Sequence, residues 1–288
     1  ALNHSGTATT SSANAGSYTI TNLAGITIAD GSGGTASNYT LTGGTHNFTV
    51  NRRIVSVSGT RLYDATTNAI ASDLSTHANL VGSETLNLSG TGTIASKNVG
   101  SNKTVTLGTL ALADGSNGGL AANYTLSGGT HQLTVNQRPL AANIARQYDG
   151  TKTAAGSDLS SFDALQGGET LTLSGSGTVG DENVANGQAV TLGTLALVDG
   201  TGLASNYSLN SASLNITKRV LNSSGSKTYD ANTDALAGAI TLSNLVSGEA
   251  LNHSGTATTS SANAGSYTIT NLAGITIADG SGGTASNY

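Results

Sequence analysis

Cysteine, methionine and tryptophan are absent from this chain of 288 residues, and Pro139 is its only proline. The lack of cysteine excludes a disulfide framework and a thiolate metal site, and it fits an exported bacterial protein. Charged residues make up only 9% of the chain and the net charge is −5, which leaves no basic patch for nucleic acid. No run approaches the roughly 18 apolar residues that span a bilayer, so we expect no membrane insertion.

The residues that are present are small, and many of them form turns. There are 39 glycines, aromatic residues amount to 4%, and serine, threonine and asparagine are frequent. Low hydrophobicity is typical of disordered chains, but those chains are usually highly charged as well. Here short runs such as TVTLGTLAL and TLTLSG alternate between apolar and polar residues. That alternation, bounded by turn-forming residues, predicts folded β-structure.

Internal repetition is the strongest signal in the sequence. Residues 1–39 are identical to residues 250–288, so the sequence returns after 249 residues. Within this interval, Asn-Tyr and Tyr-Asp pairs each recur every 81 to 85 residues. The pairs are Asn38-Tyr39, Asn123-Tyr124, Asn206-Tyr207 and Asn287-Tyr288, and Tyr63-Asp64, Tyr148-Asp149 and Tyr229-Asp230. Such periods indicate stacked copies of one supersecondary unit.

The repeats divide the chain into four parts. We predict the back part of one unit in 1–56, complete units in 57–141 and 142–219, and a unit that lacks its last strand, the counterpart of Thr40–Val50, in 220–288. Both ends are therefore expected to expose unpaired strand edges, which favour head-to-tail association of copies. The expected fold is all-β, each unit being an elongated β-sandwich or a β-grasp-like unit. Because no flexible linker separates the units, they are expected to form a rod.

Individual elements are predicted from the same patterns. In the first complete unit, strands are expected near 53–58, 61–64, 85–95, 103–112, 121–127 and 130–143. A short helix is predicted at Ala71–Leu80 and at Gly156–Leu165, whereas Gly238–Val246 is typical of a strand. The recurrence of an asparagine before the next strand indicates a turn in the left-handed conformation. Those asparagines are Asn14, Asn98, Asn183 and Asn263.

Several motifs in fixed order carry a family resemblance. RLYDATTNA, RQYDGTKTA and KTYDANTDA are followed by GSETLNLSG, GGETLTLSG and SGEALNHSG, and units end in segments such as ANYTL and GGTHQLTVNQRPL. Together they resemble the YDG-type repeats, and the related MBG-type repeats, of large bacterial surface and secreted proteins of the haemagglutinin or adhesin kind. The resemblance implies tandem extracellular β-domains that form a stalk or filament body, and it implies no catalytic residues. Only Tyr148-Asp149-Gly150 keeps a literal YDG, because Ala65 and Ala231 replace the glycine elsewhere.

Recurring tyrosines are the first candidates for a site. They are Tyr39, Tyr124 and Tyr207 of the Asn-Tyr pairs, and Tyr63, Tyr148 and Tyr229 of the Tyr-Asp pairs. One interpretation is a repeated glycan-binding module, in which the rings stack on carbohydrate. The interpretation that we favour is a half-buried core tyrosine whose hydroxyl finds a partner near the junction of two units.

Aspartates of the recurring Asp-Gly turns are the candidates for calcium. They are Asp30, Asp114, Asp199 and Asp279. Each turn supplies one carboxylate, no calcium-binding loop with a distal glutamate is present, and Asp-Gly is a common hairpin corner. We therefore expect no metal and no other cofactor.

Other recurring carboxylates precede or follow the motif strands. They are Glu84, Glu169 and Glu249, together with Asp64, Asp149 and Asp230. We expect them to pair with Arg53, Arg138 and Arg219 of the joining segments and so lock one unit onto the next. A glycosidase would need paired carboxylates in an aromatic-lined cleft of every unit. His46 and His131 align with Ala212, which argues against histidine as a ligand or general base, so we expect no enzyme.

The function expected from the sequence is mechanical. We expect a structural segment of a giant bacterial adhesin, secreted or at the cell surface, that spaces a distal binding domain or builds a biofilm matrix. Its expected partners are neighbouring repeats, other copies head to tail, and host or matrix glycans. The first alternative is a subunit of a self-assembling extracellular filament or sheath, and the second is the glycan-binding module.

Overall fold

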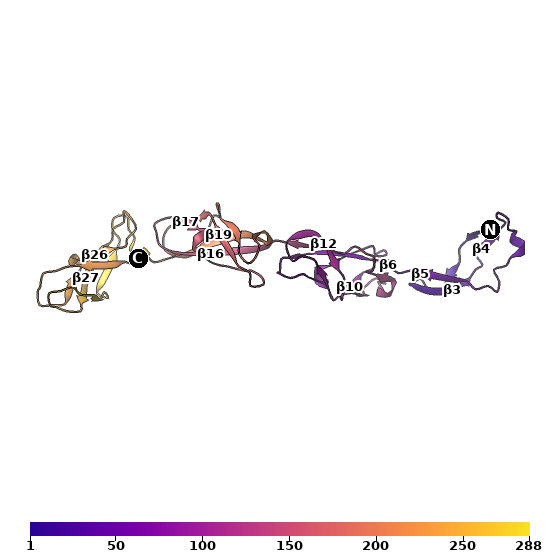
Figure 1. The fold of residues 1–288 in the computed structure, drawn as a ribbon, viewed down its shortest axis with the longest axis horizontal. Helices are drawn as coiled ribbons and strands as arrows, with labels where there is room; N and C mark the ends of the chain where they lie inside the picture. Colours follow the sequence, from indigo (N-terminus) through magenta and orange to yellow (C-terminus); the bar gives the residue numbers. More distant parts are fainter. The chain divides into compact units, whose positions relative to one another are not determined.

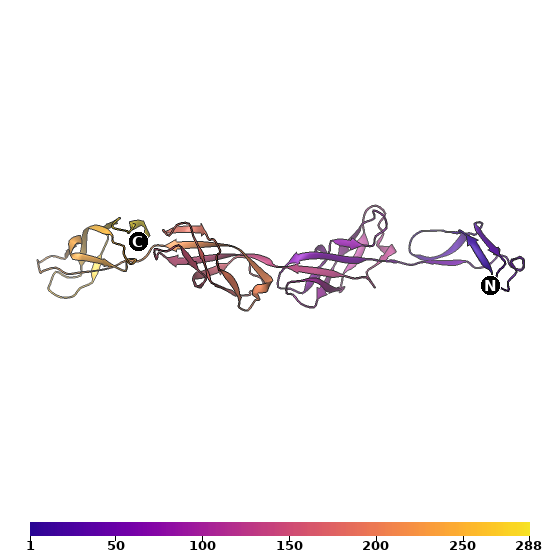
Figure 2. The same cartoon turned by 90° about the horizontal axis from the view of Figure 1, so that it is seen from above.

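The computed structural model describes residues 1–288 and is built almost entirely of β-strands (Figure 1). Helical structure is limited to seven 3-10 turns of three residues each, and none of them is long or apolar enough to cross a membrane. The all-β prediction is therefore confirmed. The chain divides into two compact units, Ala1–Gln137 and Arg138–Tyr288, and Figure 2 shows the strands of both units from a second direction.

The first part of unit 1 holds two small antiparallel sheets. One has the strand order β2-β3-β5 and the other joins β1 to β4. Strand β5 lies at the edge of its sheet, where Phe48 pairs with Tyr18 of β3, and the Phe48 side chain is 52% exposed. The bounds are β1 (Asn3–Gly6), β2 (Thr9–Thr10), β3 (Gly16–Asn22), β4 (Ile26–Ala29), η1 (Ala36–Asn38) and β5 (Asn47–Val50).

The second part of unit 1 is organised around strand β15. It lies inside a six-stranded sheet of order β8-β11-β12-β15-β7-β9, parallel to β7 and antiparallel to β12. Its alternate side chains Leu133 and Val135 are fully buried, as the period of a strand requires. The bounds are β6 (Arg53–Ile54), β7 (Ser56–Leu62), β8 (Asn68–Ile70), η2 (Ala71–Asp73), β9 (Thr76–Ala78), β10 (Leu86–Ser89), β11 (Thr91–Ile94), β12 (Gly100–Thr106), β13 (Ala111–Asp114), η3 (Ala121–Asn123), β14 (Tyr124–Thr125) and β15 (Gln132–Asn136).

Unit 2 begins with the same arrangement. Its four-stranded sheet has the order β18-β16-β23-β21, and β16 runs parallel to β23, with Ile144 opposite Leu214. Both side chains are fully buried in the hydrophobic core of this unit. The bounds are β16 (Arg138–Gln147), β17 (Thr153–Ala155), η4 (Gly156–Asp158), β18 (Leu159–Phe162), β19 (Leu171–Ser174), β20 (Ser176–Thr178), β21 (Ala185–Ala189), β22 (Ala196–Asp199), η5 (Ala204–Asn206) and β23 (Tyr207–Thr217).

The rest of unit 2 contains a second set of strands. Strand β24 pairs only with β26, and β27 pairs with β25, β28 and β29. The strand expected within Gly238–Val246 is β26. The bounds are β24 (Asn222–Gly225), β25 (Asp234–Leu236), η6 (Ala237–Ala239), β26 (Ile240–Ser243), β27 (Asn252–Thr259), β28 (Ile269–Asn271), β29 (Ile275–Ala278) and η7 (Ala285–Asn287).

The helix predicted in the middle of each complete unit is wrong in length and type. At Ala71–Leu80 the chain forms η2 and then the strand β9, and at Gly156–Leu165 it forms η4 and then β18. The edge strands β9 and β18 pair with β7 and β16. Pairing with an existing strand satisfies the backbone polar groups of these short segments, whereas an isolated helix of this length is marginal in water.

The strand predicted over 121–127 is wrong in its first half, which forms the 3-10 turn η3, and only Tyr124–Thr125 is a strand, β14. The other predicted strands are correct in place but differ in their breaks. The strand expected over 85–95 is divided at Gly90 into β10 and β11, and the one over 103–112 is divided into β12 and β13. The segment over 130–143 is divided at Gln137 between β15 and β16, whereas 53–58 and 61–64 are largely joined in β7. Strand β8 was not predicted, because its three residues carry no measurable alternation.

Glycines mark the points where a strand changes partner. Gly90 lies between β10, which pairs with β13, and β11, which pairs with β8 and β12. Its φ is +85° and an added Cβ would lie 2.2 Å from the Thr109 carbonyl oxygen. Gly175 occupies the same place in unit 2, with φ +76° and 2.1 Å to the Thr194 oxygen. Only glycine meets both requirements without strain.

Candidate functional site: the junction between repeats

A tyrosine of each later Asn-Tyr pair bonds to a recurring glutamate. The Tyr124 hydroxyl donates to Glu84, that of Tyr207 donates to Glu169 at 2.9 Å, and that of Tyr288 donates to Glu249 at 2.6 Å. Each hydroxyl also accepts a backbone N–H, from Val81, Gln166 and Val246 respectively. The three rings are 3%, 2% and 7% exposed, so each hydroxyl has both of its hydrogen-bonding functions satisfied in a buried position.

A second tyrosine from the preceding repeat joins this pair in unit 2. The Tyr148 hydroxyl donates to the other oxygen of Glu249 at 2.5 Å, and its ring lies edge-on to Tyr288 with centroids 5.6 Å apart. Glu249 therefore bridges a tyrosine of the repeat that begins at Arg138 and one of the repeat that follows it. Gly150 of the same motif packs closely against Val246 of the following repeat: a Cβ on Gly150 would lie only 2.9 Å from the Val246 side chain.

Burial sets the electrostatics of this tyrosine cluster. It raises the pKa of Tyr148 to about 12, and the hydrogen bond and the negative charge of Glu249 act in the same direction. Burial and the hydrogen bond to Glu249 also raise the pKa of Tyr288, and burial and Glu84 raise the pKa of Tyr124. These three tyrosines therefore stay protonated at neutral pH and donate hydrogen bonds to the carboxylates.

An asparagine pair forms the second contact between repeats. Asn287, fully buried, accepts the Val184 N–H at 2.9 Å and donates to the Asn183 side chain at 2.8 Å. The same geometry occurs in unit 1, where Asn123 accepts the Ala15 N–H at 2.8 Å and donates to Asn14 at 3.0 Å. The asparagine of the Asn-Tyr motif thus binds the loop of the preceding repeat.

This contact corrects one prediction. None of Asn14, Asn98, Asn183 and Asn263 has the left-handed backbone predicted for it; the left-handed asparagines are Asn79, Asn102, Asn117 and Asn244. Asn14 and Asn183 recur because they receive a side chain from the next repeat. The signal in the sequence was their joint recurrence with the asparagines of the following Asn-Tyr pairs, 109 and 104 residues later.

Two arginines of the joining segments, Arg53 and Arg219, bind asparagines where carboxylates were expected. Arg53 donates to the backbone and side-chain oxygens of Asn79 at 2.7 and 2.8 Å. Arg219 binds Asn244 in the same way, at 2.7 and 2.9 Å, and also donates to the Tyr148 carbonyl at 3.3 Å. A left-handed asparagine presents both its backbone and its side-chain oxygen to the planar guanidinium, which donates to the two acceptors at once.

The aspartates of the Tyr-Asp pairs make local contacts. Asp64 pairs with Arg61 and Asp149 with Arg146, each three residues earlier, and Asp230 pairs with Lys227 at 2.8 Å. Each also accepts the N–H two residues later, from Thr66, Thr151 or Asn232. The aspartates therefore close their own loop instead of joining two repeats.

The four calcium candidates have a shared structural contact. Each side chain accepts the N–H that opens the following 3-10 turn, at 2.6 to 2.8 Å. The pairs are Asp30 with Ala36, Asp114 with Ala121, Asp199 with Ala204 and Asp279 with Ala285. No three His, Cys, Asp or Glu side chains lie together in a geometry that could hold a metal ion.

The remaining tyrosines and the histidines complete the set of candidates. Tyr63 is fully buried, whereas Tyr39 and Tyr229 are 61% and 62% exposed. The ring nitrogen Nε2 of His46 contacts the Leu41 carbonyl at 2.8 Å, and that of His131 contacts Leu126 at 2.9 Å. Each histidine ring therefore stabilises the turn that precedes its strand.

The repeats match one known protein family. The family model of the YDG domain matches residues 49–133, 130–216 and 210–288. No curated protein matches the chain, and no solved structure matches it. The three matches follow one another along most of the sequence, so this chain belongs to the YDG domain family and carries the domain in three tandem copies.

Proposed function

We propose that this chain is a structural stalk or filament segment of a giant bacterial extracellular adhesin, which spaces a distal binding domain from the cell or builds matrix. The observation that carries the proposal is the contact between successive repeats in unit 2. Strand β23 ends at Thr217, and the Arg219 N–H already bonds to the Asn287 carbonyl at 2.9 Å. With Glu249 bridging two tyrosines, the second repeat is held to the first without a free linker.

The proposal is of a mechanical role and not of an enzyme. The recurring tyrosines, asparagines and aspartates described above make repeated contacts within or between repeats, which supports selection for a regular, stiff array. Stability in such arrays is the sum of modest cores and of interfaces between neighbours. The proposed location is the bacterial surface or the extracellular medium, and the proposed partners are neighbouring repeats and other copies of the chain.

Small-angle X-ray scattering of the chain, with and without a calcium chelator, tests the proposal. A compact fold of this length would have a radius of gyration of about 19 Å. Repeats that each span roughly 40–50 Å, as strand rise allows, would give about 45–50 Å for a stiff array. We expect the larger value, unchanged by the chelator. A compact value would contradict the stalk, and a large value that falls on chelation would assign a metal to the Asp-Gly turns.

A further inference from the structure

Two of the five histidines of the chain meet at one residue of strand β7, Val57. His77 of the edge strand β9 is paired directly opposite Val57, so both side chains lie on the same face of the sheet. Val57 is 0% exposed, and this face is therefore the one that packs into the core. On the β15 side of β7, Nδ1 of His131 lies 3.3 Å from the Val57 backbone nitrogen and accepts its N–H.

The hydrogen bonds of His131 require a neutral ring. Its Nε2 contacts the Leu126 carbonyl at 2.9 Å, and because a carbonyl oxygen can only accept, Nε2 carries the proton. Nδ1 accepts the Val57 N–H and so carries none. A second proton on the ring would set one N–H against another and break this bond. The ring is 6% exposed, so its charge would be poorly hydrated while the sheet stays closed.

His77 is also held neutral by its surroundings. Its Nε2 is buried and has no hydrogen-bond partner. Burial lowers the pKa of His77 below its ordinary value of 6.5, because a buried imidazolium loses its hydration. The folded sheet therefore binds this proton less readily than the open chain does. The stability that depends on neutral His77 is complete above pH 6.5 and is lost as the pH falls below that value.

The charged groups of the surrounding elements do not compensate for a proton on either histidine. Arg53 of β6 and Lys103 of β12 each donate to a backbone carbonyl, and Arg61 of β7 pairs with Asp64. Asp73 of η2 has a pKa that burial raises, so acid favours its folded form. Burial is the only cause of the pKa shift of the edge-strand histidine, so none of these charges offsets it.

The first repeat of unit 2 has the same strands without the histidines. Ala142 of β16 stands in the place of Val57. Phe162 of β18 lies opposite Ala142 on one side, and Ala212 of β23 lies opposite it on the other. Ala142 and Ala212 are buried, and Phe162 packs against the same core. These three side chains do not titrate, so this repeat is a natural control for the one in unit 1.

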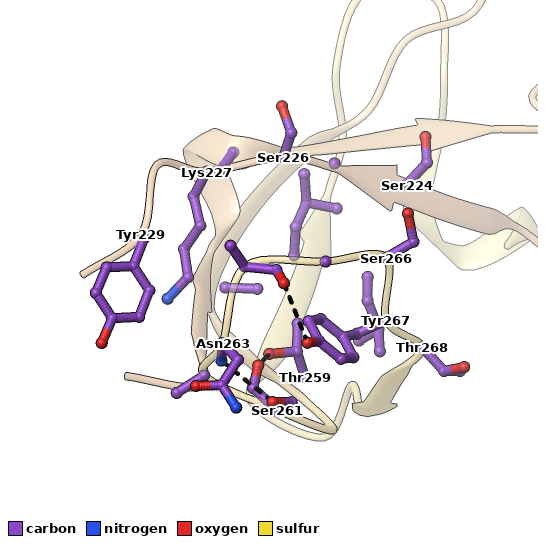
Figure 3. Close-up of a pocket in the computed structure, with 18 of the residues that line it drawn as sticks. Ser224, Ser226, Lys227, Tyr229, Thr259, Ser261, Asn263, Ser266, Tyr267 and Thr268 are labelled. Atoms are coloured by element: carbon purple, nitrogen blue, oxygen red, sulfur yellow. Dashed lines mark hydrogen bonds between the residues drawn. The ribbon is translucent and has the colours of Figure 1, made fainter. Parts of the chain in front are cut away.

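The last repeat of unit 2 shows how other titratable groups are satisfied. Lys227 and Tyr267 border a cavity of about 680 Å³ (Figure 3). Lys227 donates to Asp230 at 2.8 Å, and the Tyr267 hydroxyl donates to the Ala264 carbonyl at 3.4 Å. Nε2 of His253 lies 3.0 Å from each of two carbonyl oxygens. A buried histidine nitrogen without a partner thus occurs only in strand β9.

We propose that His77 and His131 form a pH-sensitive switch that holds the edge strand β9 on β7. At neutral pH both rings are uncharged and β9 stays paired. Below about pH 6 the rings take up protons, which water hydrates in the open state and the closed sheet does not. Strand β9 then leaves β7 and uncovers a row of backbone donors and acceptors, which is the edge that pairs with other strands. This inference goes beyond the stalk proposal, because it holds whatever the repeats are attached to.

Hydrogen exchange of the whole natural chain at about pH 7.5 and about pH 5 tests the switch. Each amide rate is divided by its intrinsic rate at the same pH to give a protection factor. Protection of β7 and β9 is expected to fall about tenfold or more at the lower pH, since each histidine can shift the opening equilibrium by up to about tenfold per pH unit. Protection of β16 and β18 in the same sample should not change. Unchanged protection of β7 and β9, or an equal fall in both repeats, would overturn the proposal.

Variants separate the two histidines from a general effect of acid. The double variant His77→Phe, His131→Ala gives unit 1 the residue types that unit 2 has at Phe162 and Ala212, and its protection is expected to be independent of pH. His253→Leu is the matched control, a histidine of another repeat, and should keep the full fall in β7 and β9. A full fall in the double variant would contradict the switch. Circular dichroism at neutral pH verifies folding, and the comparison of the two repeats in the natural chain decides the matter without any variant.

Discussion

The third position of the Tyr-Asp-Gly motif shows how single residues adapt to this fold. Gly150 has φ +73°, and Ala65 and Ala231, which replace the glycine in the other copies, have φ +63° and +62°. The backbone of this loop is left-handed whatever the residue, because the aspartate accepts the N–H two residues later in each copy. An alanine pays about 1–2 kcal/mol for this conformation and a glycine does not.

Restoring the glycine is therefore expected to stabilise the repeat. We predict that Ala65→Gly raises the free energy of unfolding of its repeat by about 0.5–1 kcal/mol, the conformational gain being reduced by the greater freedom of glycine when unfolded. Hydrogen exchange of the amides in β7 and β15 measures this. Ala111→Gly, in the exposed strand position of β13, is the control and should lower stability by about the same amount. A destabilising Ala65→Gly would contradict the strain.

At the scale of elements, the sheets depend on corners where a strand leaves one partner for another. Glycine is required at two of these corners, Gly90 and Gly175, because a left-handed φ and a nearby carbonyl oxygen leave no room for a Cβ. The alternating pattern of residues 85–95 and its counterpart predicted strands there, but not the break. The carbonyls that exclude a side chain belong to Thr109 and Thr194, 19 residues further on, so the break is a tertiary effect that local alternation does not contain.

The corner at Gly175 can be tested directly. We predict that Gly175→Ala destabilises its repeat by about 2 kcal/mol or more, because left-handed strain and the contact with the Thr194 oxygen add. Gly180 is the matched control: its φ is not left-handed and no heavy atom lies within 4 Å of an added Cβ. Urea denaturation followed by hydrogen exchange of β19 and β20 gives the comparison. Equal effects of the two substitutions would show that the corner tolerates a side chain.

The junction was predictable in part for a similar reason. Recurrence of tyrosine and glutamate at fixed spacing indicated partners near the boundary of two repeats, and such partners exist. Which groups pair was not predictable. Glu249 meets tyrosines 101 residues before it and 39 residues after it, while Arg219 binds an asparagine. A charged side chain pairs with the group that the folded sheets place beside it. The order of residues along the chain does not tell which group that is.

At the scale of the whole molecule, stability is shared between repeats. The cluster of Tyr148, Glu249 and Tyr288 belongs to both repeats of unit 2, with the Asn287 side chain and the Arg219 guanidinium beside it. Removal of one repeat would break this network and the Asn183–Asn287 pair. We therefore expect its removal to lower the stability of the neighbouring repeat. Such coupling gives a repeat array its stiffness.

This coupling has a predicted pH dependence. The pKa of Tyr148 is raised from 10.0 in the unfolded chain to about 12 in the folded one, so folding favours the protonated hydroxyl. The contribution is complete below pH 10 and is lost as the pH rises towards and through 12. We predict that the melting temperature of the natural chain falls more steeply between pH 10 and 12 than that of Tyr148→Phe. Parallel curves, or a tyrosine absorbance titration without a component near pH 12, would contradict this.

Strands β16 and β23 run side by side in the same direction, and so do β7 and β15. The chain therefore enters a repeat at one end of the ladder and leaves it at the other. A tensile load applied through Arg138 and Thr217 acts along the strands, in shear, and is divided among the ladder's hydrogen bonds at the same moment. An antiparallel terminal pair would instead be unzipped one bond at a time, so the parallel order of these two strand pairs spreads a pulling force over the whole ladder.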